Sequence, residues 1–207
     1  GKLKGEYRRE RSDDHTRDRD TYLLGAGLTR STGKDWKFLA NLDMVLSDAS
    51  EDTLNGKYVE GSVGYAYRPV ETDALNALFK YTFLYDLPGT DQVTVNGTTQ
   101  GPAQRSHILS ADVSYDLNKI VALGAKYGLR YGSTKARDGS TGWERSHAQI
   151  GIVRADLHVV HNWDALLEGR VLWNNDGTNV GVLAAVYRQV NENFKIGIDF
   201  FLSPNGK

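Results

Sequence analysis

Segments in which apolar and polar residues alternate follow one another along the whole chain. In the stretch WDALLEGRVLW (163–173), Trp163 and Val171 fall on one side of the alternation, and Glu168 and Arg170 fall on the other. A period of two belongs to a β-strand, because successive side chains of a strand point to opposite faces. A helix would mix these charged residues with the apolar ones. The chain is therefore predicted to consist of strands with one apolar and one polar face.

The same alternation predicts an all-β chain. No run of about eighteen apolar residues occurs, which excludes a transmembrane helix. The 22 glycines and 11 tyrosines suit a protein of strands and turns. Eleven strands are predicted, at residues 3–10, 21–30, 36–47, 58–68, 75–87, 107–117, 121–132, 148–159, 163–173, 180–189 and 194–202.

The links between these strands alternate in length. Short turns such as STGKD, PVETD and LNKI alternate with longer polar links such as RSDDHTRDRD, DASEDTLNGK and STKARDGSTGWERS. Tight turns at one end and long loops at the other are typical of outer-membrane barrels, which in bacterial single chains have even strand numbers. We therefore expect a transmembrane antiparallel up-and-down β-barrel of about twelve strands, with residues 1–207 as a single domain. A soluble β-sandwich that exposes its charged face stays open as an alternative.

Strand length and aromatic placement favour the membrane. The stretch from Trp163 to Trp173 is about 33 Å long, and a tilt of about 40° reduces its height to about 25 Å, the height of the apolar band of such barrels. Tryptophan and tyrosine suit the two membrane interfaces, because their apolar rings carry a polar group that needs water or another hydrogen-bond partner. The predicted interface aromatics are Trp36, Tyr85, Tyr131, Trp163, Trp173 and Tyr187.

The polar side of the alternation collects charged residues. A soluble barrel would pay a high desolvation cost to bury them, whereas an outer-membrane barrel has a polar lumen. Twelve strands would leave an aperture on the order of 10 Å or less, wide enough for small solutes unless salt bridges close it. The predicted lumen-lining residues are Glu60, Arg68, Lys80, Asp112, Lys126, Arg130, Arg154, Asp156, Glu168, Arg170 and Arg188.

Two details of this polar side concern the backbone. Gly124, Gly128 and Gly132 fall on it and are predicted to permit curvature of the sheet. In strand 148–159, Ile150 and Ile152 share a side with Arg154, and a β-bulge near Val153 would restore the apolar register.

Several stretches resemble a known family. GSVGYAYRPVETDALNALFKYTFLYDLP, HILSADVSYDLN, RADLHVVHNWDALLEGRVLW and GVLAAVYRQVNENFKIGI, over about residues 56–198, resemble the C-terminal barrel of large Gram-negative bacterial surface proteins. The resemblance implies an outer-membrane location, contact with lipid and lipopolysaccharide, insertion by the barrel-assembly machinery, and further domains of the same native chain. It implies no catalytic residue.

The end of the chain departs from the family pattern, which continues past KIGI into a loop and a closing aromatic strand. Lys195, Gly197, Phe200 and Leu202 match the polar-x-Gly-x-x-aromatic-x-apolar pattern that the assembly machinery reads. Loop lengths, however, send this strand outward, whereas a closing strand runs toward the periplasm. A missing twelfth strand, a miscounted strand and a truncated or rebuilt chain all stay open.

Candidate catalytic motifs are weak. The tripeptide RSH occurs at 105–107 and 145–147, near the expected outer rim, but Ser106 and His107 would point to opposite faces and could not form a nucleophile–base pair. No G-x-S-x-G, phosphate-binding loop or dinucleotide fingerprint occurs in a usable context. The chain is therefore not expected to be an enzyme or to carry a cofactor.

Metal and nucleic-acid sites are not expected either. His158 and His161 in HVVH straddle a strand end and a turn, where their spacing does not favour a shared metal. The acidic loop RSDDHTRDRD lacks the spaced pattern of calcium sites and contains arginines, so its charges are expected to pair with one another. A net charge of −1 provides no basic footprint for nucleic acid.

Three functional hypotheses follow. The first is a passive pore for ions or small solutes with a charged lumen. The second is a barrel that only anchors a surface or periplasmic domain. The third is a soluble β-sandwich binding module.

Overall fold

In the computed structural model, all regular secondary structure of the described residues is β. The side chains of Val159 and Val160 are not among the described parts. The structure describes residues 1–13, 15, 18–50, 55–72, 74–87, 102–136, 140–160, 162–191 and 194–203.

The described part of the chain forms eleven strands, and each predicted strand is confirmed. Two of them have the predicted bounds, and the largest differences are earlier starts at Ala103 and Glu144, which lengthen two strands into their preceding links. The strands are β1 (Lys2–Glu10), β2 (Arg19–Ser31), β3 (Trp36–Ala49), β4 (Gly56–Tyr67), β5 (Leu75–Leu87), β6 (Ala103–Asp116), β7 (Val121–Lys135), β8 (Glu144–Val160), β9 (Trp163–Asn174), β10 (Gly177–Asn191) and β11 (Phe194–Leu202).

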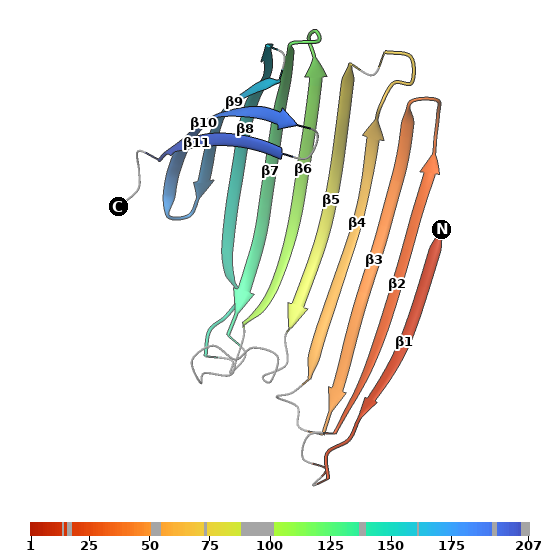
Figure 1. Ribbon diagram of the computed structural model, residues 1–207. Coiled ribbons are helices and arrows are strands. Elements are labelled where there is room, and N and C mark those ends of the chain that lie inside the picture. The colour runs from red at the N-terminus through yellow and green to blue at the C-terminus, as the bar shows by residue number, and fades with distance from the viewer. Residues whose placement is uncertain are drawn as a thin grey trace.

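The strands make one antiparallel sheet in chain order, from β1 at one edge to β11 at the other (Figure 1). The predicted all-β, antiparallel up-and-down architecture is therefore confirmed. Two packed sheets, which a sandwich requires, do not occur in the described part of the chain. No ladder between described residues joins β1 to β11. Closure into a barrel and a twelfth strand stay predictions.

The sheet is curved. In Figure 1, β1 to β8 stand side by side as a long wall, whereas β9 to β11 turn away from that direction. The turns after β2, β4, β6 and β8 lie at one end of the wall, which we call the short-turn end. Strands β1, β3, β5 and β7 end at the other end of the wall, which we call the long-link end.

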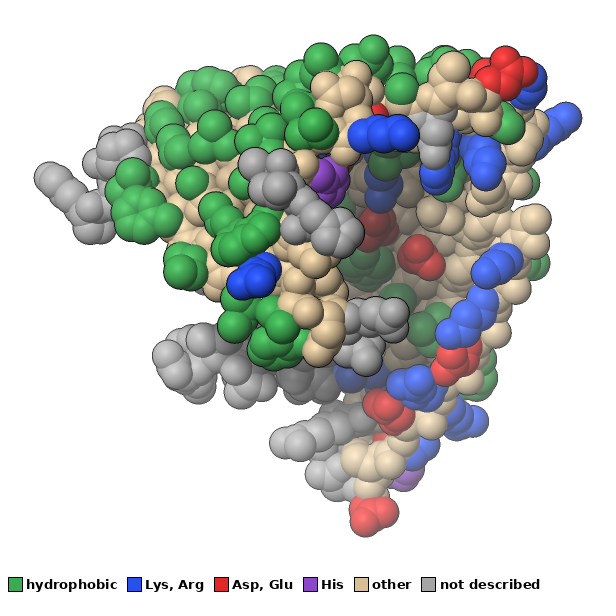
Figure 2. Space-filling view, turned by 45° about the horizontal axis from the view of Figure 1, so that its top comes forward, with side chains coloured by type: hydrophobic (Ala, Val, Ile, Leu, Met, Phe, Trp, Pro, Cys, Tyr) green, Lys and Arg blue, Asp and Glu red, His purple; other side chains and the backbone are tan. Residues whose placement is uncertain are grey.

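The register separates two faces, because residues directly opposite each other in an antiparallel ladder share a face. The face that carries Glu168 continues through its partners Arg154 and Leu183, and we call it the charged face. The face that carries Leu167 continues through Ala155 and Ala184, and we call it the apolar face. Figure 2 shows charged side chains inside the hollow of the curve and hydrophobic ones over the outer surface.

The apolar face has no covering layer in the described part of the chain. Ala103 and Ala185 are the only buried hydrophobic residues there, whereas Val153 is 65% exposed and Ile198 is 80% exposed. Burial of apolar surface is the main favourable contribution to folding in water, and a single sheet with an uncovered apolar face forgoes most of it. An exposed apolar surface of this extent is typical of a face that contacts a partner, a ligand or a membrane.

The predicted β-bulge near Val153 is wrong. The β8–β9 ladder runs unbroken through the pair Val153 and Gly169, and its irregularity lies between His158 and Val160. Ile152 accordingly stays on the charged face, directly across from Lys126 on one side and Arg170 on the other. The long apolar stems of these two cations make an isoleucine compatible with that position.

Candidate functional site

The candidate site is the charged face of the sheet. Arg68 follows the end of β4 and borders the face, in a cavity that Lys37 and Ala66 also line. The strand residues predicted to line a lumen share the face with one exception, and those that lie on it are Glu60, Lys80, Asp112, Lys126, Arg130, Arg154, Asp156, Glu168 and Arg170.

Arg188 and Tyr187 lie on the opposite sides from those predicted. Arg188 is across from Trp163 on the apolar face, with its guanidinium carbon 5.5 Å from the centre of the indole ring. Tyr187 is across from Asp164 on the charged face, with the Lys195 ammonium 5.0 Å from its ring centre. Arg188 is tolerated there because it lies near the end of β10, where a long cationic side chain can pack on the Trp163 ring and keep its charged group in water.

Opposite charges alternate over β6 to β9, which we call the paired half of the charged face. The Arg154 Nε donates to Asp156 at 2.7 Å, and the Lys126 Nζ lies 2.7 Å from Asp112. An Arg170 terminal nitrogen donates to Glu168 at 2.6 Å. Each of these three cations therefore has a carboxylate within hydrogen-bond distance, whereas Arg130, on the same face, donates its Nε to Ser106.

Arg170 is the most enclosed cation of this half. Its guanidinium lies 5.2 Å from the centre of the Phe201 ring, and its Nε is buried without a hydrogen-bond partner among the described residues. Gly181 lies directly across from Arg170, and a Cβ there would come within 3.0 Å of the Phe201 ring. The glycine thus makes room for β11 to pack its aromatic side chain over the arginine.

The charged face of β3 to β5, which we call the unpaired half, is different. Asp43 and Glu60 lie directly across from each other, and neither forms an ion pair with a described residue. The Tyr58 hydroxyl donates a hydrogen bond to Glu60. Lys80 is exposed on the same face, and no carboxylate in the described part pairs with it. This half keeps uncompensated charge of both signs.

A third cluster lies near the short-turn end. One oxygen of Asp164 is 2.7 Å from the Lys195 Nζ, and its other oxygen is 2.7 Å from the His158 Nδ1. In the part of the chain that the structure describes, no three histidine or acidic side chains come together as a metal site. His161 lies outside the described residues.

The acidic loop between β1 and β2 holds paired charges, as predicted for Asp18 and Asp20. Arg11 lies 3.6 Å from Asp18 and donates to Asp20 at 3.1 Å. The Ser12 backbone N–H donates to Asp18 at 2.9 Å, and this hydrogen bond is the main cause that lowers the Asp18 pKa. Asp14 lies outside the described residues.

The two residues Ser106 and His107 point to opposite faces, as predicted. Ser106 is fully buried and accepts a hydrogen bond from the Arg130 Nε at 3.2 Å. A Cβ on Gly132, across from Ser106, would come within 2.9 Å of the Ser106 Oγ. His107 lies on the apolar face, where its Nδ1 is 2.7 Å from the Tyr81 hydroxyl. No nucleophile–base pair forms here.

Aromatic side chains gather near both ends of the apolar face. Near the short-turn end, Trp36 packs on Tyr67 with ring centres 4.8 Å apart. Near the long-link end, Tyr7 packs on Tyr22 at 5.1 Å. The predicted interface residues on the apolar face are Trp36, Tyr85, Tyr131, Trp163 and Trp173.

The predicted assembly pattern spans both faces. Lys195 and Gly197 lie on the charged face, and Phe200 and Leu202 lie on the apolar face. Its recognition by an assembly machinery stays a prediction.

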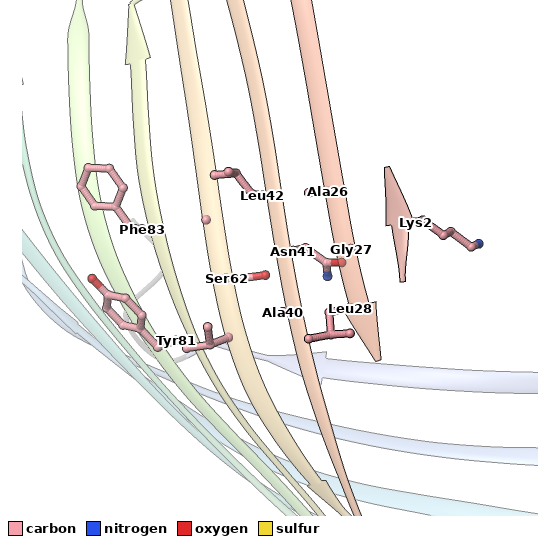
Figure 3. Close-up of a pocket in the computed structure, with 12 residues that line it drawn as sticks. Lys2, Ala26, Gly27, Leu28, Ala40, Asn41, Leu42, Ser62, Tyr81 and Phe83 are labelled. Atoms are coloured by element: carbon pink, nitrogen blue, oxygen red, sulfur yellow. The ribbon is translucent and has the colours of Figure 1, made fainter. Parts of the chain in front are cut away.

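Shallow grooves cross the apolar face where small residues lie between large ones. The groove in Figure 3 has a volume of about 410 Å³ and is lined by residues of β1 to β5. Ala26 and Ala40 form its low points, and Leu28, Leu42 and Phe83 stand around them. A flexible chain can follow such a surface, whereas a rigid partner needs matched packing.

In the described part of the chain, no helix is long and apolar enough to cross a membrane. In comparisons with known proteins, no protein-family model and no curated protein matches the chain.

Proposed function

We propose that the chain is a bacterial outer-membrane β-barrel whose charged face lines an aqueous passage for ions or small solutes. The observation that carries the proposal is the separation of charge between the two faces. Among the described residues of the apolar face, charged side chains occur only near strand ends, as at Arg30, Asp48 and Arg188. A lysine or arginine at the bilayer midplane of a barrel costs about 2–4 kcal/mol, so a lipid-facing surface has its charges at the ends.

The aromatic belts and the grooves support the same environment. Trp36 and Trp163 stand near the short-turn end, and Tyr7 and Tyr22 near the long-link end, as interfacial aromatics do. The grooves between small and large residues suit acyl chains, which adapt to an uneven surface. Outer-membrane lipid and lipopolysaccharide are the partners of this face.

The passage itself lies along the charged face. Asp43, Glu60 and Lys80 present charge that no described partner neutralises, so they would interact with permeating ions. The proposal requires that the edges of β1 and β11 be closed, because an open edge leaves backbone groups without partners in lipid.

A second candidate is a barrel that only anchors another domain of the same native chain. The ion pairs of Lys126, Arg154 and Arg170 favour it, because a neutralised network can fill a lumen. The resemblance to the C-terminal barrel of surface proteins favours it too. In that case insertion by the barrel-assembly machinery is expected, and conduction is not.

Single-channel recording in planar bilayers separates the two candidates, once heat-modifiable gel mobility has shown a folded, inserted protein. Discrete conductance steps support the passage, and Lys80→Glu should then shift ion selectivity toward cations. Arg188→Glu makes the same charge change on the apolar face and should leave selectivity unchanged. Stable insertion without steps favours the anchor. A monomer that stays soluble without detergent would refute both the passage and the anchor.

A further inference from the structure

The repeated tripeptide RSH brings two arginines to one place on the apolar face. Arg105 in β6 and Arg145 in β8 both lie directly across from Ser133 of β7, one on each side. In the adjacent row, His107 and His147 flank Tyr131 in the same way. The two copies of the motif, far apart in sequence, thus make one basic cluster at the long-link end.

The guanidinium of Arg105 is held in a fixed position. Its Nε donates to the Ser133 Oγ at 2.8 Å, and Ser133 is only 6% exposed. Its flat face lies on the Trp143 ring, with the guanidinium carbon 4.3 Å from the ring centre. Its two terminal nitrogens form no hydrogen bond or ion pair with any described residue. They are therefore free to bind a ligand.

Arg145 supplies the second cation. Its backbone carbonyl accepts a hydrogen bond from Asn175, but its exposed side chain has no polar partner in the described part of the chain. Both arginines line a cavity of about 270 Å³ together with His107, Tyr131, Ser133 and Trp143. None of the described residues that line this cavity is acidic. The cluster is thus a concave, uncompensated basic site.

We propose that this cavity binds the phosphate group of a membrane lipid. A planar guanidinium with two free terminal nitrogens matches the oxygens of a phosphate in a bidentate geometry. The cavity opens on the apolar face, beside Trp143 and Tyr131, which are of the residue types that lie at headgroup level. A lipid held there would have its acyl chains along the apolar face. The inference rests on the proposed membrane insertion.

Arg188 provides a matched comparison. It also lies on the apolar face and also stacks on an indole ring, that of Trp163 at 5.5 Å. It has no second arginine opposite it in the ladders of β10, where its partners are Trp163 and Ile196. Each end of the sheet therefore has an arginine over an indole ring. In the described part of the chain, the cavity with two arginines lies at the long-link end.

The test measures lipid binding to the full chain in detergent by native mass spectrometry. The probes are phosphatidic acid, diacylglycerol with the same acyl chains, and inorganic phosphate. Phosphatidic acid should bind at least about tenfold more tightly than diacylglycerol, because charge-assisted hydrogen bonds to two cations contribute. The double variant Arg105→Gln/Arg145→Gln should lose about tenfold or more of this affinity, and Arg188→Gln should keep it within about twofold.

The following results would contradict the inference. Equal binding of phosphatidic acid and diacylglycerol, or an unchanged double variant, overturns the phosphate site. Inorganic phosphate that binds as tightly as phosphatidic acid overturns the lipid as its source. If the double variant does not fold, Arg145→Gln alone replaces it, because that side chain holds no described partner. Membrane insertion is measured separately, by flotation of the protein with phosphatidylcholine vesicles. A protein that does not insert would refute the proposed function and not the phosphate site.

Discussion

The two halves of the charged face differ in how their charged side chains are arranged. In the paired half, Arg154 and Arg170 each hold a carboxylate two residues away on their own strand. In the unpaired half, Asp43 and Glu60 face each other as like charges across one ladder. Like charges directly opposite are destabilising, so this half must be held together by something other than charge. Under the proposed function, the paired half would stabilise the sheet, whereas the unpaired half would interact with permeating ions.

The close approach of β4 and β5 at Gly64, in the unpaired half, should be disturbed by Gly64→Ala. A Cβ at Gly64 would come within 2.9 Å of the Phe79 carbonyl oxygen, a backbone atom that cannot move alone. We expect a loss of about 1–3 kcal/mol in the free energy of unfolding, measured by urea denaturation in lipid vesicles. Gly124→Ala, in the paired half, is the control, because its nearest neighbour would be 3.8 Å away. Equal effects of the two variants would refute this difference.

Charge pairing in the paired half is tested by Glu168→Gln. The variant leaves Arg170 without its carboxylate, in a site where Glu168 is only 14% exposed and Arg170 is 39% exposed. After allowance for the exposed part, we expect a loss of about 1–2 kcal/mol in the same denaturation experiment.

Glu60→Gln is the matched variant in the unpaired half. It relieves repulsion with Asp43 and keeps an oxygen for the Tyr58 hydroxyl, so the stability should stay within about 0.5 kcal/mol or rise. A larger loss in the free energy of unfolding from Glu60→Gln than from Glu168→Gln would contradict the stated difference between the two halves.

Ion selectivity is the property that the unpaired half should control. The double variant Asp43→Asn/Glu60→Gln removes two uncompensated carboxylates, and the cation-to-anion permeability ratio should fall by about twofold. Reversal potentials in a salt gradient measure this ratio. The variant Asp112→Asn removes a carboxylate that Lys126 already neutralises, and its effect on the ratio should be smaller.

The smallest expected effect is a pH dependence outside both halves, in the loop that contains Asp18. The Ser12 N–H, His15 and Arg11 lower the pKa of this carboxyl below its ordinary value of 3.8. Since the folded state favours the charged form, its contribution to stability is present above pH 3.8 and is lost as the pH falls below that value. Limited proteolysis of the loop across this range measures the loss. Asp18→Asn should abolish the dependence, and an unchanged pH profile would refute it.

The strands could be predicted because a period of two is local information, readable without knowledge of neighbours. The sides of Tyr187 and Arg188 were predicted wrongly, because the alternation of polar and apolar residues weakens near the end of β10. Ile152 was misinterpreted for a related reason. Its compatibility with the charged face depends on Lys126 and Arg170, which lie on two other strands.

Pairing across strands is the information that the alternation lacks. Whether Asp43 meets Glu60 or a cation depends on the register of β3 against β4. The basic cluster was missed because Arg105 and Arg145 were assigned to the links, while β6 and β8 in fact begin before them. The repeat of RSH was the available indication, and its meaning needed β7 between the two copies.

The number of strands has a geometric consequence for closure. In a sheet where each strand runs opposite to its neighbour, the first and the eleventh strand point in the same direction. A direct ladder between β1 and β11 would therefore be parallel, with evenly spaced, slanted hydrogen bonds, in a sheet that is otherwise antiparallel throughout. One additional strand between them would restore alternation of direction. The parity of the strand count thus determines which kind of seam a cylinder built from this sheet would have.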